Sequence, residues 1–110
     1  MATLLVTYVG DTSARFDRAY YTTHHLPLVS RAWDPYGLQR VEAYFWDGGE
    51  GTDVPIAICL CQFGDSEEID LALAADESVE VMDDIANFTD VEPTRSVMEQ
   101  AATTQSARRR

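Results

Sequence analysis

Residues 55–63 restrict the fold of this chain more than any other stretch, because all of them except Gln62 are apolar. A short apolar run bounded by turn-forming residues on both sides predicts a strand rather than a helix. An amphipathic strand has one apolar face, whereas this run has two, which is typical of a central strand buried on both sides. Any fold for the chain must therefore place this strand at the centre of a sheet.

The other apolar patterns predict the order strand, helix, strand, strand, helix, strand. Strands are expected at residues 3–9, 38–46, 55–63 and 90–98, and helices at 14–23, 27–33, 66–75 and 77–88. Thr12 or Ser13 is the expected N-cap of the first helix. The βαββαβ order predicts an α+β, ferredoxin-like fold with a four-stranded antiparallel sheet and both helices on one face. We expect one domain over residues 1–99 and a flexible polar tail at 100–110.

The first helical region holds both histidines of the chain, next to a proline. Pro27 lacks an N–H group and disfavours helical geometry at Leu26, so we expect the helix to break near residues 24–26. The break would expose His25 at the rim of a pocket, where an imidazole that titrates near neutrality can transfer protons. The alternative is that His25 only bonds to backbone groups that the break leaves free.

Helices on one face of the sheet would leave the other apolar face of residues 55–63 bare, with Tyr44, Phe45 and Trp46 beside it. A bare apolar face is a liability for a monomer. We therefore expect a homodimer, in which a second copy covers this face and a cavity remains between the two sheets.

Composition excludes several kinds of partner. The net charge is −11, with 19 acidic residues against 8 arginines, so we expect no binding to nucleic acid or to an anionic membrane. The sequence has no secretory signal and no apolar run near the roughly 20 residues of a membrane span, so we expect a cytoplasmic protein. Cys59 and Cys61 are poorly spaced for a disulfide or a zinc site and are interpreted as small wall residues in a reducing compartment.

Several short motifs resemble the EthD family. They are F-D-x-x-Y-Y-x-x-H-x-x-P-L at residues 16–28, H-x-P-L from residue 25, Trp33 before Gly37-Leu38, Phe63 before a helix, and D-x-x-x-F-x-D at residues 84–90. The match spans about residues 4–99. The resemblance implies the dimeric α/β-barrel superfamily: a homodimer with sheets packed face to face and a small-molecule cavity in each subunit. The superfamily includes lactone isomerases, polyketide cyclases, cofactor-free monooxygenases and haem-binding enzymes, and EthD itself is an accessory to bacterial ether degradation.

The resemblance also suggests site residues. His25 matches the family's H-x-P-L histidine and is the expected general acid/base, and Asp84 matches an acid that would orient His25 or act as a base. The expected binding residues are Tyr21, His24, Thr7, Tyr44, Trp46, Cys59, Cys61 and Met82. Each has a structural alternative: aromatic residues also build cores, and Asp84 beside Asp83 also fits a solvated helix face. The histidine spacing suits no metal, and we expect no cofactor; a haem with one axial histidine is the alternative.

Three functions fit these features. The first is a cofactor-free enzyme that carries out proton-transfer chemistry (isomerisation, cyclisation or oxygenation) on an apolar cyclic or polyketide-like metabolite in catabolism. The second is a non-catalytic accessory protein that binds an apolar metabolite for a monooxygenase degradation system. The third is a structural dimer whose cavity is filled by side chains, and the presence or absence of a void between sheet and helices distinguishes it from the others.

Overall fold

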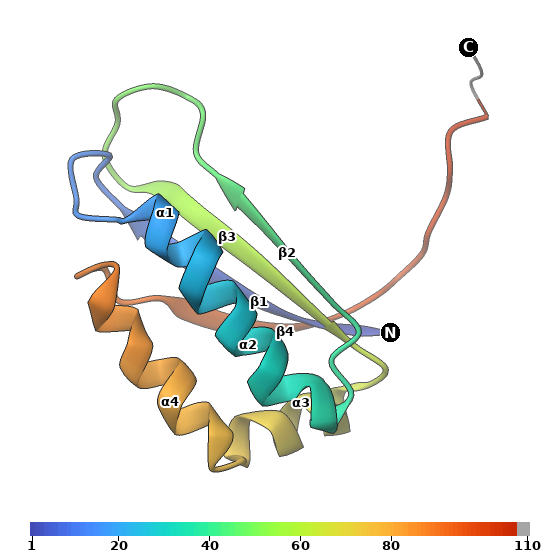
Figure 1. The fold of residues 1–110 in the computed structure, drawn as a ribbon. Helices are drawn as coiled ribbons and strands as arrows, with labels where there is room; N and C mark the ends of the chain where they lie inside the picture. Colours follow the sequence, from blue (N-terminus) through green and yellow to red (C-terminus); the bar gives the residue numbers. More distant parts are fainter. Residues whose placement is uncertain (108–110) are drawn as a thin grey trace.

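The computed structural model describes residues 1–107 and shows one four-stranded sheet with all helices on one side (Figure 1). The strands are β1 (Ala2–Gly10), β2 (Arg40–Phe45), β3 (Val54–Phe63) and β4 (Thr94–Glu99). The helices are α1 (Arg18–Tyr20), α2 (Leu26–Trp33), α3 (Ser66–Ala74) and α4 (Glu77–Asp84). The predicted βαββαβ order is confirmed; the end of the expected tail, residues 108–110, lies outside the described residues.

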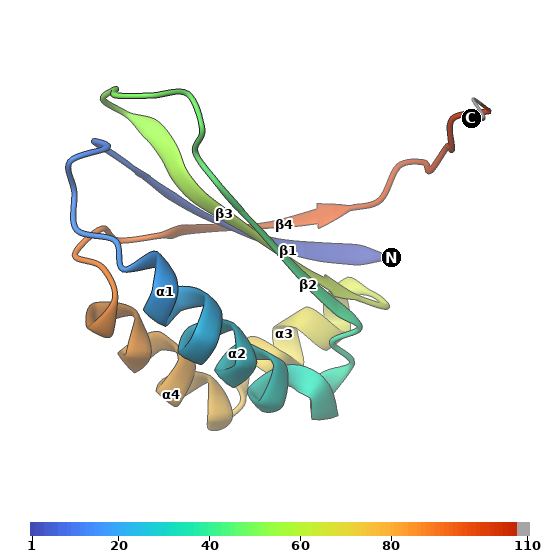
Figure 2. The same cartoon turned by 45° about the horizontal axis from the view of Figure 1, so that its top comes forward.

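The sheet has the strand order β2-β3-β1-β4, and every neighbouring pair is antiparallel. This is the ferredoxin-like arrangement, with β1 and β3 at the centre. Figure 2 shows the helices packed together against one face, while the opposite face carries no other element. No helix within residues 1–107 combines the length and the apolar character needed to cross a bilayer.

The core lies between the sheet and the helices. On β3, Cys59, Cys61 and Phe63 point toward the helices and are buried. Ile58 and Leu60 point to the opposite face and remain partly exposed. Within one chain the strand is therefore buried on the helix side only, because no element of residues 1–107 covers the other face (Figure 2).

The first helix begins later than predicted. Asp17, not Thr12 or Ser13, is the N-cap, and its side chain accepts a hydrogen bond of 3.0 Å from the Tyr20 backbone N–H. The Asp17 backbone N–H donates to the carbonyl of Phe88 at 2.8 Å, which holds Asp17 in an extended conformation. A tertiary contact thus sets the start of the helix, and sequence alone does not show it.

The expected break at residues 24–26 does not occur. His25 and Leu26 keep helical backbone angles, and the chain passes from α1 to α2 through a π-helical segment, η1 (Tyr21–His25). The Leu26 N–H bonds to the carbonyl of Tyr21, five residues earlier. A wide turn of this kind accommodates a proline without ending the helix.

The two edge strands begin later in the sequence than predicted. β4 begins at Thr94 rather than near residue 90, because Thr89 pairs with Phe16 in an isolated bridge and its hydroxyl donates to the Arg15 carbonyl at 2.6 Å. Pro93 follows and cannot donate to a strand ladder. β2 begins at Arg40 instead of residue 38, after the helical turn η2 (Asp34–Tyr36) and Gly37 in the left-handed region at φ 102°.

Candidate functional site

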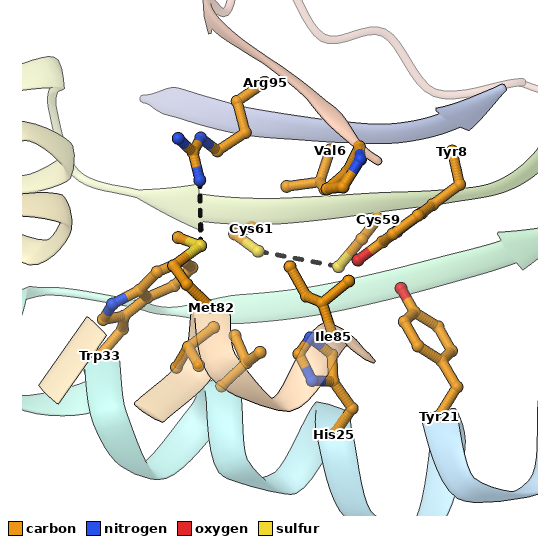
Figure 3. Close-up of a pocket in the computed structure, with 13 residues that line it drawn as sticks. Val6, Tyr8, Tyr21, His25, Trp33, Cys59, Cys61, Met82, Ile85 and Arg95 are labelled. Carbon is orange, nitrogen blue, oxygen red and sulfur yellow. Dashed lines mark hydrogen bonds between the residues drawn. The ribbon is translucent and has the colours of Figure 1, made fainter. Parts of the chain in front are cut away.

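A small cavity lies between the sheet and the helical layer (Figure 3). Its wall consists of Val6, Tyr8, Tyr21, His25, Val29, Trp33, Cys59, Cys61, Val81, Met82, Ile85, Pro93 and Arg95. The space between their atoms is about 380 Å³, including the part that opens to solvent, whereas only about 30 Å³ admits the centre of a water molecule. The cavity is therefore present but narrow, and its wall is mainly apolar.

The π-helical segment η1 brings Tyr21 and His25 to the cavity. The two side chains are four residues apart, both are buried, and their rings stack with centroids 5.6 Å apart. Thr22 and Thr23 take the opposite side, where their hydroxyls donate to backbone carbonyls of the preceding turn. π-Helical turns occur often at functional sites because they redirect side chains, and here the wide turn points an imidazole inward.

Asp84, at the end of α4, holds the His25 ring. Its Oδ2 lies 2.9 Å from His25 Nδ1, while its Oδ1 accepts from the Tyr20 hydroxyl at 2.5 Å and from the Asn87 amide at 3.0 Å. Burial lowers the pKa of His25, although the hydrogen bond to Asp84 opposes this shift. Partial burial alone would raise the pKa of Asp84, but the hydrogen bonds from Tyr20, Asn87 and His25 together lower it.

These directions give a neutral imidazole beside an ionised carboxylate at neutral pH. The carboxylate can only accept, so the His25 proton lies on Nδ1 and Nε2 carries the lone pair. Within residues 1–107, Nε2 has no hydrogen-bond partner, and no fully enclosed side-chain nitrogen or oxygen lacks one. Nε2 therefore keeps an open surface on the cavity side of a residue that is only 4% exposed. An oriented imidazole with a free Nε2 can act as a general base.

Tyr8 is the main site residue that the sequence analysis missed. It lies on β1, is 1% exposed, and packs edge-on against Tyr21 with ring centroids 6.2 Å apart. Burial raises the pKa of Tyr8 and, together with the nearby Cys59, that of Tyr21, so both hydroxyls stay protonated. Only the alternation of β1, which puts Tyr8 on the same face as Leu4, could have pointed to it.

Two sulfur groups and one cation complete the wall. The thiols of Cys59 and Cys61 lie side by side, with their sulfurs 3.7 Å apart. A hydrogen bond from Cys61 lowers the pKa of Cys59, and the same bond and burial raise the pKa of Cys61. Arg95, on β4, is the only permanently charged residue of the wall, and its guanidinium donates to the sulfur of Met82 at 2.9 Å.

The structure brings together some of the predicted residues and separates others. The cavity is lined by the predicted residues His25, Tyr21, Cys59, Cys61 and Met82. Asp84 is not part of the wall but is hydrogen-bonded to His25. Four predicted binding residues lie elsewhere: Thr7, Tyr44, Trp46 and His24.

The four residues away from the cavity have clear positions. Thr7 and Tyr44 both oppose Ile58 in the strand register, so they lie on the sheet face away from the helices. The Trp46 indole N–H donates to the carbonyl of Gly49 at 2.7 Å in the loop after β2. The exposed His24 ring lies against Tyr20, with centroids 4.8 Å apart. None of these four side chains lines this cavity, because the strand register and the helical phase point them elsewhere.

No group of three or more histidine, cysteine, aspartate or glutamate side chains within residues 1–107 is arranged to hold a metal ion. The cavity groups that can act chemically are the imidazole of His25, the hydroxyls of Tyr8 and Tyr21, and the thiol of Cys59.

Comparison with known proteins finds similarity in the structure. No protein-family model and no curated protein sequence matches the chain. An EthD-like protein from Ralstonia eutropha superposes with a TM-score of 0.79 at 25% identity, over 97% of this chain and 96% of that one. An EthD family protein from Bacillus halodurans has a TM-score of 0.68 at 21% identity, over 91% of this chain and 98% of that one.

A third structure extends the similarity beyond EthD. SnoaB, a cofactor-independent oxygenase from Streptomyces nogalater, has a TM-score of 0.60 at 9% identity, over 96% of this chain and 98% of its own. This identity shows a common fold alone. The structure thus confirms the resemblance that the sequence motifs predicted: the chain has the ferredoxin-like fold of EthD-like proteins and of other proteins of the dimeric α/β-barrel type.

Proposed function

We propose that this protein is a cofactor-free enzyme that transfers protons to and from a small apolar metabolite, with His25 as general base and then general acid. The observation that carries the proposal is the pairing of His25 Nδ1 with Asp84 at 2.9 Å, which leaves Nε2 open toward an apolar cavity. Asp84 acts as a positioning residue, because it fixes the tautomer and stabilises the imidazolium that forms when His25 takes up a proton. Isomerisation, cyclisation and oxygenation of a carbanion all begin with such a transfer.

The similar structures support this class of chemistry. SnoaB is a cofactor-independent oxygenase on the same fold, and the fold itself is used for many activities, so the reaction must be argued from the site. Here the argument rests on the His25–Asp84 pair and on the apolar wall around it, because exclusion of water strengthens the interactions of a charge that develops during the reaction. A cyclic or polyketide-like substrate remains the class that suits an apolar, aromatic wall.

The test compares two neighbouring histidines. His25→Ala removes the base, whereas His24→Ala changes an exposed ring on the same helical segment and is the matched control. Cyclic ketones, lactones and polyketide fragments would be incubated with each protein, and products or deuterium uptake from D₂O followed by mass spectrometry. We expect exchange with the wild type and with His24→Ala, and a loss of about 10²–10⁴-fold with His25→Ala. Full exchange with His25→Ala would refute the proposal.

A non-catalytic carrier is the second candidate, and the narrow, mainly apolar interior favours it. Only about 30 Å³ of the cavity admits the centre of a water molecule, so any metabolite must displace wall side chains to enter. A carrier for a monooxygenase degradation system would bind its metabolite equally well in wild type and His25→Ala and would return it unchanged. Calorimetry with the same compounds, followed by mass analysis of the recovered ligand, separates the two functions.

We also propose that the protein acts as a homodimer through the uncovered face of its sheet. Leu5 of β1 lies opposite Leu60 of β3 in the strand register, with Ile58 in the next row. All three are partly exposed in the single chain, and neighbouring polar residues surround them. An apolar centre with a polar rim is typical of a protein–protein interface.

A further inference from the structure

We propose that the hydroxyls of Tyr8 and Tyr21 form a two-donor site for the carbonyl oxygen of the substrate, so that the substrate is a carbonyl compound with an acidic α C–H bond. This inference rests on the proposed function, because it identifies the atom that carries the charge when His25 removes a proton. The two hydroxyls would bind the carbonyl oxygen before the transfer and the enolate oxygen after it.

The first observation concerns the partners of these two hydroxyls. Tyr8 and Tyr21 are each 1% exposed. Within residues 1–107, neither hydroxyl makes a hydrogen bond to an oxygen or nitrogen atom; the Tyr21 hydroxyl interacts with the thiol of Cys59, which is a weak acceptor. No fully enclosed side-chain oxygen within residues 1–107 lacks a partner, so each hydroxyl keeps either open surface at the cavity or a contact with sulfur. Both hydroxyls can therefore donate to an oxygen atom that enters the cavity, which is a better acceptor than sulfur.

Other buried polar groups of the same layer are satisfied. The Trp33 indole N–H donates to Ser78 Oγ at 2.7 Å, and the Ser78 hydroxyl donates in turn to the Ala72 carbonyl. The Tyr20 hydroxyl donates to Asp84 at 2.5 Å. Among the described residues, the groups without an oxygen or nitrogen partner in this layer are thus ones that face the cavity, namely the two tyrosine hydroxyls and His25 Nε2.

The second observation is convergence. Tyr8 enters from the sheet and Tyr21 from the helical layer, and in Figure 3 both hydroxyl oxygens point toward the sulfur of Cys59. The ring of Tyr21 also stacks on His25. One ligand oxygen placed between the hydroxyls would therefore lie in the same cavity as the free Nε2 of His25. Two convergent donors beside a base are the parts that stabilise a developing oxyanion.

One positive charge of the wall acts at this point. Arg95 is the only permanent charge on the cavity wall, and its positive charge acts on the Tyr8 hydroxyl, where it works against the increase that burial causes in the pKa. The hydroxyls remain protonated donors, since burial raises the pKa of both tyrosines. The wall therefore offers donors and a distant cation to an anion inside a protein whose overall charge is −11.

The step conserves atoms and electrons without another reactant. His25 Nε2 forms a bond to the α-proton, the C–H electron pair moves into the new C=C bond, and the carbonyl π pair moves onto oxygen as the enolate. Tyr8 and Tyr21 donate to that oxygen while Asp84 stabilises the imidazolium. Return of the proton from Nε2 to the other end of the enolate or dienolate completes an isomerisation and restores the neutral imidazole.

Binding of a phenol tests the site without any turnover. 4-Fluorophenol carries an oxygen in place of the enolate oxygen, and 4-fluorotoluene has nearly the same shape without it. Fluorine NMR titrations would compare both probes on the wild type, Tyr8→Phe, Tyr21→Phe, the double variant and Tyr20→Phe. We expect the wild type to prefer the phenol by about tenfold or more. Each cavity variant should lose several-fold of this preference and the double variant nearly all of it, while Tyr20→Phe keeps it.

Thermal unfolding of the same proteins provides a second readout. Within residues 1–107 the Tyr8 and Tyr21 hydroxyls make no bond to oxygen or nitrogen, and the Tyr21 hydroxyl has only the weak thiol partner Cys59, so their phenylalanine variants should have a Tm equal to or above that of the wild type without ligand. Tyr20→Phe loses its bond to Asp84 and should have a Tm several degrees lower.

Three results would overturn the assignment: equal affinity of the wild type for both probes, no phenol binding at millimolar concentration, or a lowered Tm in the Tyr8 and Tyr21 variants. Failure of the proposed function has a different signature. If the protein is only a carrier, His25-dependent deuterium exchange is absent, while the tyrosine-dependent preference for the phenol persists.

Discussion

At the level of single residues, the contact between His25 and Asp84 is a hydrogen bond between a neutral ring and a carboxylate. Burial lowers the pKa of the imidazole, so the ring is uncharged at neutral pH and the pair is not a salt bridge. Three donors keep the Asp84 carboxylate ionised and fixed in position. The arrangement suits a base that must be neutral before it takes up a proton and stabilised afterwards.

The lowered pKa of His25 makes the stability of the fold depend on pH in a defined range. The unfolded chain, with a histidine pKa of about 6.5, binds the proton more readily than the folded one. The free energy of unfolding is therefore highest above pH ~6.5 and falls as pH drops through the lower folded-state pKa. Urea unfolding between pH ~5 and ~8 should show this decrease in the wild type and in His24→Gln. The same decrease in His25→Gln would show that another group causes it.

Asp84→Asn tests the positioning role. An amide can present its N–H₂ group to Nδ1, which favours the wrong tautomer, so we expect the rate of proton transfer to fall by about 10²–10⁴-fold with little change in ligand affinity. Asp83→Asn removes the adjacent, exposed carboxylate and should leave the rate unchanged. A parallel loss of affinity in Asp84→Asn would indicate that the carboxylate shapes the cavity rather than the imidazole.

At the level of helices and strands, periodicity predicted which segments are helical but not how they join. Pro27 correctly indicates an irregularity, yet the chain accommodates the proline through the π-helical turn η1 and the helix does not break. The difference depends on contacts made far away in the sequence: the Asp17 N–H bonds to the Phe88 carbonyl, and Asp84 bonds to His25. A pattern that is local in sequence cannot contain these contacts.

A buried polar chain also joins three helices. Trp33 of α2 donates to Ser78 of α4, which donates to the Ala72 carbonyl of α3. Ser78→Ala would leave the indole N–H buried without a partner, so we expect a loss of about 1–3 kcal/mol in the free energy of unfolding. Urea denaturation measures it, with Ser30→Ala as an exposed control. A loss below about 0.5 kcal/mol would mean that the indole finds another acceptor.

For the whole molecule, the sequence predicted the order of strands and helices along the chain and an apolar sheet face without helices, and the structure has both (Figure 2). It did not predict which side of β1 faces the helices, because Leu4 and Val6 on one side are as apolar as Leu5 and Val9 on the other. The pairing of β1 with β3 decides which face of β1 points toward the helices, and this pairing exists only in the folded sheet. Tyr8 was missed and Thr7 was misplaced for this single reason.

The uncovered face gives a prediction for the oligomeric state. Leu5→Arg puts a charge at the centre of the proposed interface, and we expect sedimentation to show a dimer for the wild type and a monomer for this variant. Val79→Arg changes an apolar side chain that is 61% exposed on α4 and should leave the dimer intact. A monomeric wild type at micromolar concentration would remove the proposed interface.

Because the cavity is narrow, its wall must open before a molecule the size of a metabolite can enter. Entry then waits for an opening motion, so association should be far slower than diffusion allows and insensitive to how tightly the guest finally binds. Cys59 and Cys61 stand at the back of this space and can record the motion. Alkylating reagents of graded size would modify these thiols at rates that report how often and how widely the cavity opens.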